Sequence, residues 1–188
     1  MARILNRYMI AIIPPEEINE QIRRFQYDMA ERFQSSKALR NIPHITLKAP
    51  FQTVDEEHTI VVKWFEKLQT DISPFTVGIN GFGSFSGSAR PVIYAMPVAN
   101  LVLGGLQKQI IQQFSGVFPA IKVSHTEKVF SPHITIAYRD LKPEFFLEAW
   151  VEYANLPYNA SFQVSGFHLL QHDGSSWNTI SEHSLKSS

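Results

Sequence analysis

Two histidines of this chain stand in the same short sequence. Pro-His-Ile-Thr occurs at residues 43–46 and again at residues 132–135, so that His44 and His133 are 89 positions apart. In a β-strand, residues two positions apart point to the same face of the sheet. Each histidine would therefore project together with the threonine that follows it, Thr46 or Thr135. If the two segments face each other, two imidazoles and two hydroxyls surround one point.

This set of side chains suits the hydrolysis of a phosphodiester. The reaction needs a base that takes a proton from water and an acid that protonates the leaving oxygen, on opposite sides of phosphorus. Because an imidazole has an unperturbed pKa of about 6.5, one ring can be neutral while the other is cationic near neutral pH. Threonine hydroxyls can donate to the non-bridging oxygens. We expect His44 and His133 to be the acid–base pair, in either assignment, and Thr46 and Thr135 to bind the phosphate.

Similar elements surround the two motifs in the same order. The first half predicts a strand at 7–13, a helix at 16–33, a strand at 44–51, a helix after a capping box at Thr53 and Glu56, and a strand at 75–85. The second half predicts a strand at 91–98, a helix capped by Asn100, a strand at 133–138, a helix opened by Pro143, and strands at 160–170 and 176–181 that turn at Asp173-Gly174.

A second repeated feature supports duplication of the chain. Gly-Phe occurs at residues 81–82 and 166–167, in both cases at a predicted strand. Together with the matched order of elements, this predicts an α+β fold in which duplicated βαβαβ-like halves form a bilobal, pseudo-twofold domain with a central cleft. We expect a single domain over residues 1–188, with lobe-forming halves at about 1–86 and 87–183 and a flexible tail at 184–188.

The composition limits the kinds of partner. Of 188 residues, 44% are hydrophobic and none is cysteine, which allows a core and excludes disulfides and thiolate metal sites. Lys and Arg together number 17, as do Asp and Glu. Proteins that follow a long duplex usually carry a basic surplus, so we expect a small phosphodiester or an RNA end instead. No apolar run is long enough to span a bilayer, and we expect a cytoplasmic protein without membrane contact.

The paired motifs resemble those of a known family. Two His-x-Thr motifs, each on a strand of a duplicated domain, are similar to those of the two-histidine (2H) phosphoesterase superfamily. Its members include RNA 2′,3′-cyclic phosphodiesterases, also called 2′-5′ RNA ligases or LigT-like proteins. The resemblance spans residues 7–181 and implies a bilobal fold with a positively lined cleft. It implies the same roles for the four motif residues, and activities that open 2′,3′-cyclic phosphates or cleave and join 2′-5′ linkages without a required metal.

Residues beside the motifs are candidates for a substrate rim. They are Lys48, Phe51, Lys128, Phe130, Tyr138 and Arg139. Basic side chains could meet phosphates there, and aromatic rings could stack on a base. The segments before the motifs, 34–42 and 118–131, are predicted to be loops near the cleft with further cations, including Lys37 and Arg40. A strand continued through Tyr138 would turn Arg139 away from the cleft.

Three other uses of these residues stay open. The groove could bind a nucleotide or an RNA end without turnover, because donors for a phosphate serve binding equally well. Two histidines could belong to a metal site, but no carboxylate or sulfur lies next to either motif, so we expect neither a metal nor another cofactor. The third use is ligation of 2′-5′ linkages, the reverse chemistry. A lone histidine on a strand is usually structural, and it is the matched pair that favours catalysis.

Overall fold

The elements follow the predicted alternation of strands and helices. The computed structural model describes residues 5–87 and 90–186. Its elements are β1 (Leu5–Ile12), α1 (Glu16–Phe33), η1 (Lys37–Arg40), β2 (Ile45–Val54), η2 (Asp55–Glu57), α2 (His58–Glu66), β3 (Phe75–Phe85), β4 (Val92–Pro97), α3 (Leu101–Val117), α4 (His125–Lys128), β5 (Ile134–Ala137), α5 (Pro143–Tyr153), β6 (Asn159–Val164), β7 (Gly166–His172) and β8 (Trp177–Ser184). The predicted α+β class is confirmed.

The strands form one antiparallel sheet in the order β6-β3-β4-β5-β2-β1-β7-β8. Its two halves meet where β5 pairs with β2, through the single registered pair Ile45 and Ile134. These two isoleucines occupy the same position of the repeated tetrapeptide. Outward from this pair, β1 matches β4 and β7 matches β3, so the repeated Gly-Phe pairs also fall on equivalent strands. The pseudo-twofold relation therefore passes between the two His-Ile-Thr segments.

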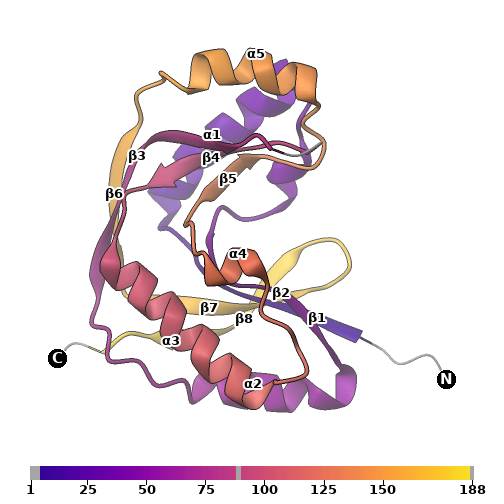
Figure 1. Ribbon diagram of the computed structural model, residues 1–188, viewed down its shortest axis with the longest axis vertical. Helices are drawn as coiled ribbons and strands as arrows, with labels where there is room; N and C mark the ends of the chain where they lie inside the picture. Colours follow the sequence, from indigo (N-terminus) through magenta and orange to yellow (C-terminus); the bar gives the residue numbers. More distant parts are fainter. Residues whose placement is uncertain (1–4, 88–89, 187–188) are drawn as a thin grey trace.

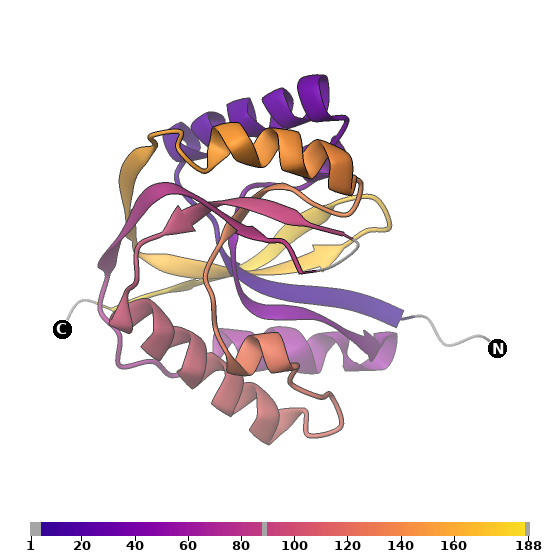
Figure 2. The ribbon, with the colours of Figure 1, turned by 45° about the horizontal axis from the view of Figure 1, so that its top comes forward.

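The two lobes exchange segments of the chain. One half of the sheet consists of β1, β2, β7 and β8, and the other of β3 to β6. The helix after β1 crosses to the opposite half, since α1 packs on β5 and beside α5, whereas α3 follows β4 and packs on β2. Figures 1 and 2 show α1 and α5 together at one end and α2 and α3 together at the other. The expected lobes at 1–86 and 87–183 are therefore wrong.

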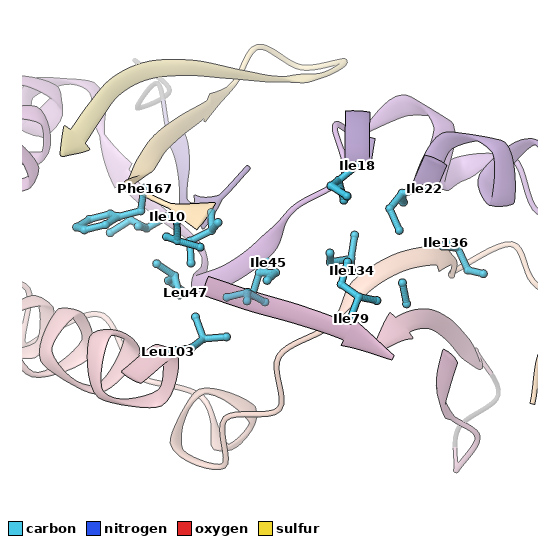
Figure 3. Packing of buried hydrophobic residues seen from close by; sticks show 14 of the residues in the cluster. Ile10, Ile18, Ile22, Ile45, Leu47, Ile79, Leu103, Ile134, Ile136 and Phe167 are labelled. Atoms are coloured by element: carbon cyan, nitrogen blue, oxygen red, sulfur yellow. The ribbon is translucent and has the colours of Figure 1, made fainter. Parts of the chain in front are cut away.

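The hydrophobic core reflects this exchange of helices between the two halves. Ile22 of α1 and Leu103 of α3 are fully buried. Figure 3 shows Ile22 on the side of Ile134, which lies on β5, and Leu103 on the side of Leu47, which lies on β2. Because each helix buries its apolar stripe on strands from the other half of the sequence, the lobes cannot separate without exposing this core.

Two of the three sequence signals that predicted helix starts are confirmed. The side chain of Asn100 accepts hydrogen bonds from two backbone N–H groups of α3, and Pro143 opens α5. The expected capping box at Thr53 and Glu56 is wrong, because β2 stays paired with β1 to its last residue and buries Thr53. The helix starts later, at His58.

The end of the chain also differs from expectation. The predicted strand at 160–170 divides at Ser165 into β6 and β7, which lie in opposite halves of the sheet. The hairpin turn at 173–174 is confirmed between β7 and β8. Of the predicted tail, Ser184 belongs to β8, and Leu185 is buried with its N–H donating to the Ser165 carbonyl at 2.8 Å. A tail that begins at 184 is therefore wrong, and residues 187–188 lie outside the described part.

Candidate active site

The four motif side chains come together at the junction of the two sheet halves. With Ile45 opposite Ile134, the antiparallel register sets His44 across from Thr135 and Thr46 across from His133, all on one face of the sheet. The four residues line the same cavity, whose volume is about 840 Å³. The geometry that the repeat predicts is therefore present, while the catalytic roles of these residues stay predictions.

Both imidazoles are held in the same orientation. Nδ1 of His44 lies 2.7 Å from the carbonyl oxygen of Ile42, and Nδ1 of His133 lies 2.9 Å from that of Ser131. A carbonyl can only accept, so Nδ1 carries the hydrogen in both rings. Nε2 of each ring is then the atom available for proton transfer. The two equivalent hydrogen bonds, each to the residue two positions before, repeat the pseudo-twofold relation at atomic scale.

The environment favours neutral imidazoles. Burial lowers the pKa of His44 below its usual value, and the charge of His133 lowers it further, although the hydrogen bond to Ile42 acts in the opposite direction. Burial also lowers the pKa of His133. The ring of His133 lies against two aromatic rings, with centroids 5.3 Å from Phe85 and 5.5 Å from Tyr94. These surroundings favour the neutral form of both rings, which is the form that can accept a proton.

The two threonines have different neighbours, one through its side chain and the other through its backbone. The Oγ1 of Thr46 lies 3.8 Å from the sulfur of Met9 on β1. The backbone carbonyl of Thr135 accepts a hydrogen bond of 3.0 Å from Nε2 of Gln26, a buried residue of α1. The crossing of α1 into the other lobe therefore steadies the strand that carries the second motif.

Lys48 is not a rim residue. It is 1% exposed, and its ammonium lies 2.8 Å from a carboxylate oxygen of Glu127 in α4. Strand alternation would have placed it on the face of His44, but the pairing of β1 with β2 shifts at this point, and the consecutive residues Leu47 and Lys48 are both buried. Such a bulge turns the side chain to the opposite face of the sheet. The expectation was wrong because the sequence alone does not show the bulge.

The other rim candidates divide between core and cavity. Phe51 is buried in the core beside Phe114, so the expectation of a base-stacking ring there is wrong. The residues that line the cavity do not include Lys128 or Phe130, and Phe130 packs against the core.

Tyr138 and Arg139 do line the cavity. The backbone of Arg139 has a φ of 58° in the turn that follows β5, so the alternation of the strand does not continue to it. Its guanidinium lies over the ring of Tyr138, 5.2 Å from the centroid. This turn explains why Arg139 reaches the cavity although a continued strand would have turned it away.

A carboxylate connects the basic loop before the first motif to the turn after the second. Asp140 accepts hydrogen bonds from the Ser35 hydroxyl and from the backbone N–H groups of Ser36 and Lys37, at 2.9, 3.0 and 2.9 Å. The cavity lining includes Lys37 and Arg40 on this loop. The segment is a short 3₁₀ helix, η1, rather than the expected loop without regular structure.

Several lining residues escaped the sequence analysis. They are Arg7, Met9, Gln26, Asn41, His172 and the β7–β8 hairpin residues Gly174, Ser175, Ser176 and Trp177. Most belong to elements far from the motifs in sequence, and only the pairing of β1 with β2 and β7 brings them near. The lining contains the cations Arg7, Lys37, Arg40 and Arg139 and, among the described residues, no carboxylate. A chain of zero net charge therefore gathers positive charge in this cavity.

Two further observations concern metals and membranes. Within residues 5–87 and 90–186, no group of three or more His, Asp or Glu side chains is placed to hold a metal ion. None of the helices in this part of the chain is both long and apolar enough to span a lipid bilayer.

The site defines a class of protein, namely one with paired His-x-Thr segments in a pseudo-symmetric cleft. Residues 14–176 match the family described as the 2′-5′ RNA ligase superfamily. The chain belongs to this superfamily of LigT-like, two-histidine phosphoesterases. It is 31% identical over 172 residues to "Putative phosphoesterase GK0864" of Geobacillus kaustophilus (strain HTA426), with 91% of each chain covered. A protein of Geobacillus sp. (strain WCH70) with a similar name is 30% identical over the same length.

Solved structures share the fold at lower identity. Escherichia coli LigT complexed with 3′-AMP matches with a TM-score of 0.69 and 20% identity, covering 98% of this chain and all of that one. LigT complexed with ATP matches with a TM-score of 0.68 and 21% identity over the same share of this chain. At this level of identity the comparison concerns the architecture of the chain.

Proposed function

We propose that this phosphoesterase-family chain is a metal-independent phosphodiester hydrolase that opens 2′,3′-cyclic phosphates of nucleotides or RNA ends. The observation that carries the proposal is the pair of imidazoles that line one cavity with equivalent Nδ1 hydrogen bonds, which leave Nε2 as the nitrogen for proton transfer. Two such groups on opposite sides of a phosphorus provide the base and the acid that in-line attack requires.

The reaction would divide between four side chains. One imidazole takes a proton from water at Nε2, and the water oxygen forms a bond to phosphorus. The bond to the 2′- or 3′-oxygen breaks as the other imidazole, protonated at Nε2, gives that oxygen its proton. The hydroxyls of Thr46 and Thr135 donate to the non-bridging oxygens, where negative charge grows in the transition state. The net proton count is unchanged, so the two rings exchange protonation states during one turnover.

The ligands of a structurally similar protein and the charge of the cavity support a substrate of nucleotide size. The structures of E. coli LigT with 3′-AMP and with ATP show that a protein of this fold binds small nucleotides. The cations of the cavity lining suit an anionic ligand. We therefore propose a small phosphodiester or an RNA end as the substrate.

Assays with several phosphodiesters test this proposal. Nucleoside 2′,3′-cyclic phosphates and RNA oligonucleotides with a cyclic phosphate end are offered in the presence of EDTA, and phosphomonoester products are quantified. Hydrolysis in EDTA is expected. Binding without any product would instead identify a binding module, and activity lost in EDTA but restored by a metal would identify a metal-dependent hydrolase. Product analysis at high RNA concentration would reveal 2′-5′ ligation.

A further inference from the structure

A second group of side chains lines the cavity away from the histidines. Arg7 of β1 and residues Gly174 to Trp177 of the β7–β8 hairpin belong to the same lining as the two motifs. The reaction proposed above leaves these residues without a role. The inference drawn from them rests on that proposed function and concerns the class of substrate.

Arg7 is held in place by an aromatic ring. Its guanidinium lies 5.4 Å from the centroid of the Trp177 ring. Trp177 packs against the small buried cluster that includes Met9, and the ring of His172 meets it edge-on at 5.0 Å. An arginine supported on a tryptophan face keeps its N–H donors oriented and loses less freedom when it binds an anion.

No carboxylate neutralises Arg7 in the described part of the chain. The ion pairs found there involve Arg32, Lys48 and His168, not Arg7. The nearby hairpin carboxylate, Asp173, is engaged within its own turn, where it accepts backbone hydrogen bonds of 2.8 Å from Ser175 and Ser176. Those donors lower the pKa of Asp173 far below its usual value. Arg7 is half-buried on the cavity wall and forms no ion pair within residues 5–87 and 90–186, so its guanidinium can bind an anion there.

Arg7 is too far from the motifs to share their phosphate. Ala11 of β1 pairs with Thr46, and Arg7 lies four residues earlier on the same strand. At a rise of about 3.3 Å per residue, the two positions are about 13 Å apart along β1. Trp177 pairs with His172 at the Arg7 end of the sheet, so the stacking holds the guanidinium at that end.

We propose that Arg7, supported by Trp177, binds a second phosphate of the substrate whose scissile phosphate lies between the histidines. That second phosphate would be either a flanking diester of an RNA end or a terminal phosphate of a small nucleotide. The substrate would then be a cyclic phosphate with a further phosphate some distance away, and a bare nucleoside 2′,3′-cyclic phosphate would leave this part of the cavity empty.

The experiment compares three substrates and two arginine variants. The substrates are a nucleoside 2′,3′-cyclic phosphate, its 5′-phosphorylated form and a trinucleotide with a 2′,3′-cyclic phosphate end. Arg7→Gln is compared with Arg24→Gln, which removes an exposed arginine that does not line the cavity. For the substrate that reaches the site, Arg7→Gln is expected to raise KM about tenfold, the low end for a charge-assisted hydrogen bond.

The pattern across substrates identifies the source of the second phosphate. An effect that begins with the 5′-phosphorylated nucleotide indicates a terminal phosphate, and an effect confined to the trinucleotide indicates a flanking diester of an RNA end. With the trinucleotide, the slope of log KM against log salt should also fall by about 0.7 when one phosphate contact is lost. Trp177→Leu should act in the same direction, and Trp177→Phe should restore most of the affinity.

Two results would overturn the inference while leaving the proposed function intact: an equal effect of Arg7→Gln on all three substrates, or no effect on any. If the wild-type protein hydrolysed none of the three, the proposed function would fail instead. The affinities of the wild-type protein and of Arg7→Gln for a trinucleotide with a 3′-phosphate end would then test whether Arg7 binds a second phosphate. A tenfold loss in Arg7→Gln would support the second phosphate site, and an unchanged Kd would overturn it.

Discussion

At the scale of single residues, the chemistry depends on how each imidazole is held. The main-chain carbonyls of Ile42 and Ser131 accept hydrogen bonds from the Nδ1–H groups, so backbone geometry rather than an acidic side chain leaves Nε2 of each ring for the proposed proton transfer. The identities of these histidines and threonines could be predicted from the sequence, because a repeated tetrapeptide with strand alternation is a local pattern. The hydrogen bonds that orient the rings could not, since they depend on the path of the chain before each strand.

The threonines provide a first prediction at this scale. Thr46→Val and Thr135→Val each remove one hydroxyl while keeping the branched shape that suits a strand. If the hydroxyls donate to the growing charge on the phosphate, kcat should fall by about 10- to 10³-fold, by analogy with the loss of one oxyanion donor. Steady-state kinetics on a 2′,3′-cyclic nucleotide measure this effect. Unchanged kcat in both variants would mean that neither hydroxyl touches the phosphate.

The lowered pKa values of the histidines predict the pH dependence. A pair in which one ring is neutral and the other cationic gives a bell-shaped profile whose apparent pKa values belong to the pair. Because burial lowers the pKa of both His44 and His133, the pH optimum of kcat/KM should lie below about 6.5, the usual pKa of an imidazole. The profile for kcat should lie at higher pH, since a bound phosphate anion favours the imidazolium. A kcat/KM optimum well above neutral pH would contradict this assignment.

At the scale of elements, the bulge in β2 determines on which face of the sheet the side chain of Lys48 lies. It turns Lys48 into the core, where it pairs with Glu127 of α4. Glu127 also accepts hydrogen bonds from the backbone of Ala49 and from Ser124, which closes a capping box at the start of α4. The segment that leads to His133 is therefore tied to the strand that follows His44. A bulge is set by the pairing of two strands, so this role of Lys48 could not be read from its neighbours in sequence.

Removing one partner of this buried pair should destabilise the fold. Burial alone would raise the pKa of Glu127, but the hydrogen bonds from Lys48 and Ser124 outweigh it and lower the pKa. Glu127→Gln leaves the buried ammonium uncompensated and should reduce the free energy of unfolding by about 3–5 kcal/mol. The double variant Lys48→Met with Glu127→Leu should recover much of that loss.

Chemical denaturation measures these free energies. Glu148→Gln, on the exposed face of α5, is the matched control and should change little. The contribution of Glu127 should be present above the usual carboxyl pKa and should disappear as the pH falls through its lowered value, because the carboxylate is the form that the fold stabilises. A single variant as stable as the wild-type protein would show that the pair has no structural role.

At the scale of the whole molecule, duplication and exchange together produce the site. The repeat predicted the elements and the pseudo-twofold relation, and both are present in the sheet order. It did not predict that α1 and α3 each cover strands of the opposite half, because the order of elements along a chain does not specify which strands pair. The hairpin that contributes Trp177 and the strand that contributes Arg7 reach the cavity through the same long-range pairing.

The central claim is that both imidazoles act on one phosphorus, and single-turnover hydrolysis of a 2′,3′-cyclic nucleotide tests it most directly. His44→Ala and His133→Ala should each slow the chemical step by about 10²- to 10⁴-fold, and the double variant should lose much less than the product of the two. His125→Ala, which changes an exposed histidine outside the cavity lining, should match the wild-type protein. A rate within a few-fold of wild type in either single cavity variant would contradict the account.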